Sequence, residues 1–113
     1  MNRTVVLDLP NAAGRRRVAG QVVLALAIAC GTGPLAGERL RRSIESVAAE
    51  TAGTLTIDAV AERGSLDLSL SASPDAGWAD RAASLLETHG AVRTAGGVRI
   101  QVRRTALSRV PDV

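Results

Sequence analysis

One apolar run constrains the fold of this chain more than any other feature. It covers thirteen positions from Val18 to Cys30, follows three consecutive arginines, and contains Gln21 as its one polar side chain. Its larger apolar residues recur at helical spacing: Val18, Val22, Leu26 and Ala29, with Val23 and Ile28 widening the face. Thirteen residues are too few to cross a bilayer. We therefore expect a helix over residues 12–30 that is buried on most of its circumference.

The same stretch carries the outward signs of an export signal. Arginines precede an apolar segment, and "AIAC" is similar to a lipoprotein cleavage site. However, the alternating run "TVVLDLP" predicts a complete strand before the arginines, and cleavage would remove the first strand and helix of the domain. Cys30 is the only cysteine, so no internal disulfide and no cysteine cluster for a metal is expected. These features favour a folded domain in the cytoplasm.

Periodicity and turn residues divide the rest of the chain. Period-two alternation predicts strands, glycines and prolines mark the breaks, and helical spacing marks two more helices. The expected elements are a strand at 4–9, a helix at 35–51, a hairpin at 54–71 turning near Arg63 and Gly64, a helix at 79–90, and strands at 91–94 and 98–103. The second helix should turn Leu40, Ile44, Val47 and Ala48 inward.

The order of these elements is β-α-α-β-β-α-β-β, with short connections. Helices grouped on one face of a mostly antiparallel sheet give a two-layer α+β sandwich. We expect one domain over residues 1–104 and a C-terminal tail over residues 105–113.

Charge and composition argue against a nucleic-acid partner. The net charge is only +3, all 14 basic residues are arginines spread along the chain, and Trp78 is the only aromatic side chain that could stack on a base. No membrane partner, cofactor or metal is indicated either.

The order of elements, with "RTVVLDLP" leading, the hairpin "GTLTIDAVAERGSLDLSLS" and the ending "HGAVRTAGGVRIQVRR", resembles the histidine kinase-like ATPase superfamily. It is most similar to the small anti-sigma-factor serine kinases of bacterial partner switching. The resemblance covers residues 3–104 and rests on architecture and spacing more than on motifs. It implies the same two-layer fold and a role in transcription regulation.

The ATP-site motifs of that superfamily are degenerate here. Its magnesium-binding asparagine on the second helix falls on Ala49 if Glu45 is taken as the base, or on Glu50 in the apolar register. The aspartate that receives the adenine amino group falls on Ala72, and the "DAG" at Asp75 comes three residues late. The segment before the third helix is too short for a phosphate-binding lid. The resemblance therefore implies a pseudo-kinase that has no catalytic, cofactor-binding or metal-binding residues.

Four residues are candidates for partner binding: Arg15, Arg16, Arg17 and Trp78. Three cations at a helix N-terminus oppose the helix dipole, so an acidic partner surface is one explanation and solvation is the other. Trp78 is either an interface anchor or a cap that packs the third helix on the sheet. We expect structural roles for His89, at a helix end, and for Cys30, as a small buried residue.

Three functions remain open. The first is a regulatory interaction module that binds a sigma factor or a partner-switching antagonist without ATP. The second is a divergent ATP-dependent serine kinase in which Glu50 or Asp75 replaces lost ligands. The third is a homodimeric scaffold domain that presents its sheet or its Trp78 surface to a second copy.

Overall fold

The computed structural model describes residues 3–103. The observed order of strands and helices is the predicted one. The elements are β1 (Arg3–Leu9), α1 (Arg15–Ala29), α2 (Pro34–Ala49), β2 (Thr54–Glu62), β3 (Ser65–Ser73), α3 (Trp78–Leu85), the 3-10 helix η1 (Glu87–His89), β4 (Val92–Thr94) and β5 (Gly97–Arg103). The predicted tail at residues 105–113 lies outside the described residues.

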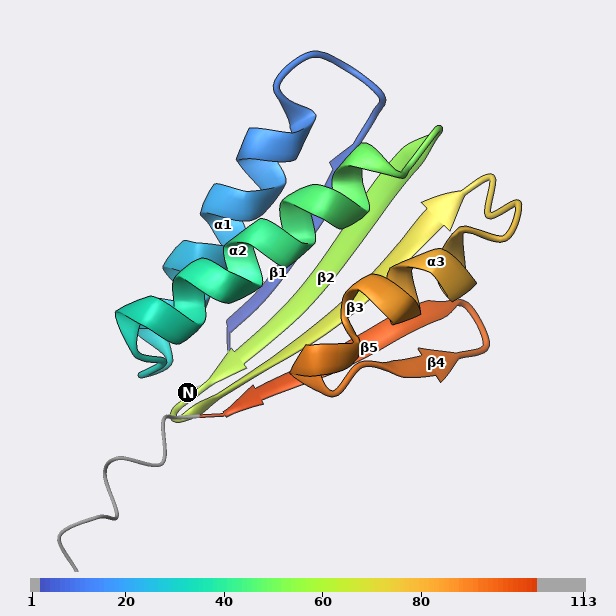
Figure 1. Cartoon of the computed structure of the whole chain (residues 1–113). Coiled ribbons are helices and arrows are strands. Elements are labelled where there is room, and N and C mark those ends of the chain that lie inside the picture. Colours follow the sequence, from blue (N-terminus) through green and yellow to red (C-terminus); the bar gives the residue numbers. More distant parts are fainter. Residues whose placement is uncertain (1–2, 104–113) are drawn as a thin grey trace, which may run out of the picture.

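The sheet has five strands in the order β1-β2-β3-β5-β4, and every neighbouring pair is antiparallel. Figure 1 shows α1, α2 and α3 side by side on one face of this sheet, with α1 toward the β1 edge and α3 toward the β4 edge. The predicted α+β fold with helices on one face is therefore confirmed.

The core lies between the helices and the alternating residues of the central strands. Period-two alternation puts one row of each strand against the helices, as the sequence predicts. The buried rows are Leu55, Ile57 and Ala59 in β2, Leu66, Leu68 and Leu70 in β3, and Val98 and Ile100 in β5. The inward residues predicted for α2, Leu40, Ile44, Val47 and Ala48, are all buried.

The third helix is shorter than its sequence pattern indicates. The α-helix ends at Leu85, and residues Glu87–His89 form a tighter 3-10 turn that ends at Gly90. In this turn the His89 N–H donates to the carbonyl of Leu86 at 2.9 Å. The change of helix type at the end of an α-helix is common and moves only the boundary of the element.

The first helix is less buried than predicted. Its buried residues are Arg15, Ala19, Gly20, Val23 and Ala27. The predicted inward stripe is only half-buried at Val22 and Leu26 and exposed at Val18 and Ala29, so the expectation of burial around most of α1 is wrong. The sandwich has two layers, and α1 is its outermost helix on the β1 side (Figure 1), so one side of the helix has no neighbouring element among residues 3–103. Within residues 3–103 no helix has the length and hydropathy needed to cross a membrane.

A backbone contact at the start of β5 gives a first prediction. A Cβ at Gly97 would overlap the carbonyl oxygen of Leu70, whereas a Cβ at Gly96 would have no atom within 4 Å. We expect Gly97→Ala to lower the free energy of unfolding by about 2 kcal/mol or more, because the paired strands β3 and β5 must separate locally. Urea denaturation measures this loss. Gly96→Ala is the matched control and should stay within about 0.5 kcal/mol of the wild type; equal effects from both would contradict the contact.

Candidate functional site

The three consecutive arginines at the start of α1 do not point the same way. Gly14, the residue before the helix, adopts a left-handed conformation with φ of 87°. Successive helical residues are about 100° apart around the axis. Arg15 consequently turns into the domain and is only 8% exposed, whereas Arg16 and Arg17 are exposed.

The Arg15 guanidinium donates to four backbone carbonyl oxygens. Nη1 donates to Leu9 at 3.3 Å and to Gly53, and Nη2 donates to Ala48 at 3.2 Å and to Thr51. These acceptors lie at the end of β1, at the C-terminal end of α2, and just before β2. One side chain therefore joins the end of β1, six residues before it, to acceptors that lie 33 to 38 residues after it.

This contact explains the position of the first arginine. The last carbonyls of α2 have no partners within the helix and carry its negative dipole end. In the described part of the chain the guanidinium has no carboxylate partner, so the cation is stabilised by carbonyl dipoles alone. The prediction that Arg15 faces a partner is wrong, because its side chain is buried and its donors are occupied.

Trp78 is also inside the domain. Its side chain is 1% exposed, and the indole Nε1 donates to the Thr51 hydroxyl at 2.7 Å. The same hydroxyl donates to the carbonyl of Val47 at 2.7 Å. Of the two alternatives for Trp78, the structure supports the cap that packs α3 on the sheet, and an interface anchor is ruled out by its burial.

Asp75 has a structural role in the same region. Its carboxylate accepts from the backbone N–H of Ala79 at 3.1 Å, in the first turn of α3. A carboxylate at this end of a helix satisfies a free N–H and complements the dipole. The aspartate of the "DAG" stretch therefore stabilises the start of α3.

Three further residues correspond to the ATP site of the superfamily that the chain resembles: Ala49 in α2, Glu50 directly after it, and Ala72 in β3. Ala49 is exposed at the end of α2, and Glu50, the next residue, pairs with Arg81 of α3 at 3.7 Å. Ala72, opposite Leu55 in the sheet, is half-buried. Methyl groups at Ala49 and Ala72 offer no ligand to a cation or to an adenine amino group.

Two adjoining surface depressions share Arg16 in their lining. Arg16 borders one of about 510 Å³ with Asn11 and Glu50, and a second of about 450 Å³ with Arg42 and Leu85. Arg17 is exposed one position further along α1. Within residues 3–103 none of Arg16, Arg17 and Arg42 makes an ion pair. We call these three residues the arginine surface.

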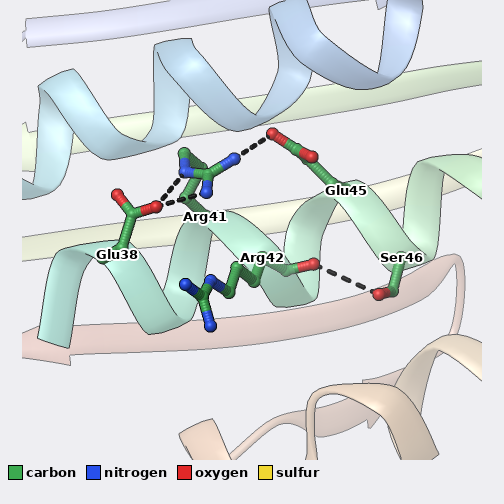
Figure 2. A network of polar contacts seen from close by, with 5 residues as sticks. All are labelled: Glu38, Arg41, Arg42, Glu45 and Ser46. Carbon is green, nitrogen blue, oxygen red and sulfur yellow. Dashed lines mark hydrogen bonds and ion pairs between the residues drawn. The ribbon is translucent and has the colours of Figure 1, made fainter. Parts of the chain in front are cut away.

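Arg41 makes ion pairs with two carboxylates, whereas its neighbour Arg42 makes none with the described residues. Figure 2 shows Arg41 between Glu38 and Glu45, both of which it pairs with, while the Arg42 side chain extends away from this network. The Arg41 hydrogen bond lowers the pKa of Glu38 below its ordinary value. The hydrogen bond of Arg42 in this network comes from its backbone carbonyl, which accepts from the Ser46 hydroxyl at 3.2 Å. Its guanidinium adds to the lowering of the Glu38 pKa through its charge but makes no ion pair with the carboxylate. Its charge therefore stays available at the surface.

His89 and Cys30 have the structural positions expected of them. His89 lies at the end of η1, and its Nε2 is 2.9 Å from the Ser43 hydroxyl of α2. Partial burial lowers the pKa of this imidazole below 6.5. Cys30 is buried after α1, and burial raises the pKa of its thiol, which disfavours the reactive thiolate. Among the described residues, no group of histidine, cysteine and carboxylate side chains has the arrangement of a metal site.

No protein-family model matches the chain, and no curated protein is similar enough to it to count as a match. The site is therefore interpreted from its own residues.

The burial of Arg15 gives a second prediction. We expect Arg15→Met to lower the free energy of unfolding by about 3 kcal/mol, because it leaves buried carbonyls without donors. Arg15→Lys keeps the charge but has fewer donors and should give an intermediate loss. Urea denaturation followed by circular dichroism measures both. Arg16→Met is the control and should change stability by about 0.5 kcal/mol or less; a comparable loss from Arg16→Met would contradict the assignment.

His89 gives a third prediction. Its folded-state pKa lies below the ordinary value of 6.5, so the unfolded chain binds the proton more tightly. The stabilisation from neutral His89 is complete above pH 6.5 and is lost as the pH falls through the folded-state pKa. As the only histidine, it can be followed by NMR without ambiguity, and its titration midpoint should lie below 6.5. His89→Gln should weaken the acid-side loss of stability; a midpoint above 6.5 would refute the burial effect.

Proposed function

We propose that this protein is a regulatory interaction module that binds an acidic protein surface through Arg16, Arg17 and Arg42, without using nucleotide. The observation that carries the proposal is the arginine surface itself. Its three cations are exposed, two of them border the same depression, and none makes an ion pair with a carboxylate of the described residues. Exposed cations that are not held in ion pairs attract an acidic partner and set its orientation.

The charge distribution favours a protein over a nucleic acid as this partner. Glu45 and Glu50 border the same depression as Arg16 and Arg42. Carboxylates among the cations repel a phosphate backbone but can accept donors from a protein surface. The chain also has no aromatic side chain exposed for stacking, because its single aromatic residue, Trp78, is buried.

The resemblance to anti-sigma factors suggests which protein is bound. A sigma factor or a partner-switching antagonist is the proposed partner, and transcription regulation in the cytoplasm is the proposed setting. Nucleotide independence is supported by the side chains at the resembled ATP site. Ala49 and Ala72 cannot act as ligands, Asp75 caps α3, and Trp78 packs into the junction of α2 and α3.

The proposal predicts binding that depends on the arginine surface. We expect Arg16→Glu/Arg17→Glu to weaken partner binding at least about tenfold, mainly through slower association, with a smaller effect at high salt. Affinity capture from the native lysate, with mass spectrometry, identifies the partner, and biosensor measurements with the purified partner give the affinity. Arg39→Glu/Arg99→Glu is the matched control, because it makes the same charge change at exposed arginines elsewhere.

Nucleotide addition separates this proposal from the kinase alternative. Capture should give the same partner in the same amount with and without Mg-ATP. Calorimetry with millimolar Mg-ATP should give no binding heat. Capture of the partner only in the presence of Mg-ATP would contradict the proposal. Equal capture by the double variant and the control would contradict it as well.

A further inference from the structure

A third surface cavity lies between α2 and η1. Its volume is about 470 Å³, and its lining consists of Ala36, Arg39, Arg42, Ser43, Thr88 and His89. The four residues from α2 are spaced three and four positions apart, so they share one side of the helix. Thr88 and His89 belong to η1 and supply the rest of the lining. The cavity therefore combines polar side chains of two elements that are far apart in the sequence.

One contact joins the two elements across the cavity. His89 Nε2 lies 2.9 Å from the Ser43 hydroxyl oxygen, and both residues are half-buried. Gly90 ends η1 in a left-handed conformation, and its N–H donates to the carbonyl of Glu87 at 3.0 Å. When Nε2 carries the ring proton, it donates to the Ser43 oxygen and leaves the hydroxyl proton available to a ligand. The shape of the cavity is thus set before anything binds.

The charge of the cavity is positive. Arg39 and Arg42 are exposed, and neither makes an ion pair with the described residues. None of the described residues that line the cavity is acidic, whereas both depressions that border Arg16 include Glu50. Glu87, next to Thr88 in sequence, is exposed and does not belong to the lining. An anion in this cavity would consequently meet two cations and no lining carboxylate.

The acidic residues of α2 lie on another side of the helix. Glu38 and Glu45 both pair with Arg41 (Figure 2). This row faces α1, because a Cβ at Gly20 would lie 2.7 Å from Glu45 Cγ and 3.0 Å from Arg41 Cγ. The Arg42 side chain extends away from the row. α2 thus separates its charges, with an ion-paired row toward α1 and two arginines without ion pairs beside η1.

These groups match the chemistry of phosphate. A guanidinium is a planar fork that donates two parallel N–H bonds to two oxygens of one anion, and the cavity has two such forks. The hydroxyls of Ser43 and Thr88 are further donors. A phosphate group offers at least three oxygens and about two negative charges, whereas a carboxylate offers two oxygens and a single charge. The volume lies within the range of small-molecule sites, about 300 to 1,000 Å³.

We propose that the cavity between α2 and η1 binds phosphate, as the free ion or as a small phosphate monoester. Arg39 and Arg42 pair with the phosphate oxygens, and the hydroxyls of Ser43 and Thr88 donate to them. A small ligand suits this cavity better than a phosphorylated protein, because peptides are usually bound along a sheet edge or a longer groove.

This cavity is distinct from the sites described above. Ser43 lies six residues before Ala49, which is about 9 Å along the axis of α2. Asp75 precedes α3, whereas η1 follows it. The proposed phosphate therefore does not occupy the nucleotide site of the resembled superfamily. The inference does not rest on the proposed function, because it needs no protein partner and shares only Arg42 with the arginine surface.

Titration of the full chain with sodium phosphate tests the cavity. His89 is the only histidine, so its ring signals in NMR report binding directly, at neutral pH and with sodium chloride keeping the ionic strength constant. We expect saturable shifts with a Kd on the order of 1 mM. Sodium acetate is the control ion and should bind at least about tenfold more weakly.

Three ligands distinguish the possible sources of the phosphate. Glycerol 3-phosphate that binds more tightly than inorganic phosphate identifies a monoester, and the reverse order identifies the free ion. A blocked tripeptide with a central phosphoserine should bind no more tightly than glycerol 3-phosphate. Tighter binding of this peptide would assign the cavity to a phosphorylated protein and overturn the proposal of a small ligand.

Variants separate a specific site from general attraction to a basic protein. Arg39→Gln removes one guanidinium and should weaken phosphate binding at least about tenfold. Arg39→Lys keeps the charge but loses the fork, and should give an intermediate loss. Arg63→Gln is the matched control, because it makes the same charge change at an exposed arginine in the turn between β2 and β3. Circular dichroism checks that the variants fold. Shifts that do not saturate, equal binding of acetate, or equal losses in Arg39→Gln and Arg63→Gln would each overturn the proposal.

Discussion

The fold depends on one buried guanidinium. Arg15 closes the point where β1 ends, α2 ends and β2 begins, and it donates to backbone carbonyls at each of these places. A planar group with five donors can satisfy several such carbonyls at once. Thr51 adds a second layer, because its carbonyl accepts from Arg15 while its hydroxyl connects Trp78 of α3 to Val47 of α2. All three helices therefore meet at a single polar junction inside an otherwise aliphatic core.

This junction also accounts for the unfavourable start of α1. A cation at a helix N-terminus is repelled by its own helix, but the C-terminal end of α2 lies beside it and has the opposite polarity. Arg15 therefore loses little from α1 and gains from α2. Arg16 and Arg17 receive no such compensation from the described residues, which is why they, with Arg42, remain the candidates for an external partner.

The helices and strands can be predicted from the sequence, but the polar junction around Arg15 cannot. Alternation in β2 and β3 and the spacing of Leu40, Ile44 and Val47 are local patterns, and they predicted the strands and α2. The burial of Arg15 could not be predicted in this way, because two of its acceptors are 36 and 38 residues away and are carbonyls, which every residue has. The opposite holds for Val18, where the apolar pattern indicates burial but does not say which neighbour supplies it, and the side chain is 45% exposed.

The position of Trp78 has a practical consequence. It is the only aromatic residue of the chain, so the near-ultraviolet signal of this protein comes from one indole, and that indole is hydrogen-bonded to Thr51 at the point where the helices meet. Its emission colour follows the polarity around it. The chain thus contains an intrinsic optical probe of its most connected point, and opening of the α2–α3 junction can be followed without any added label.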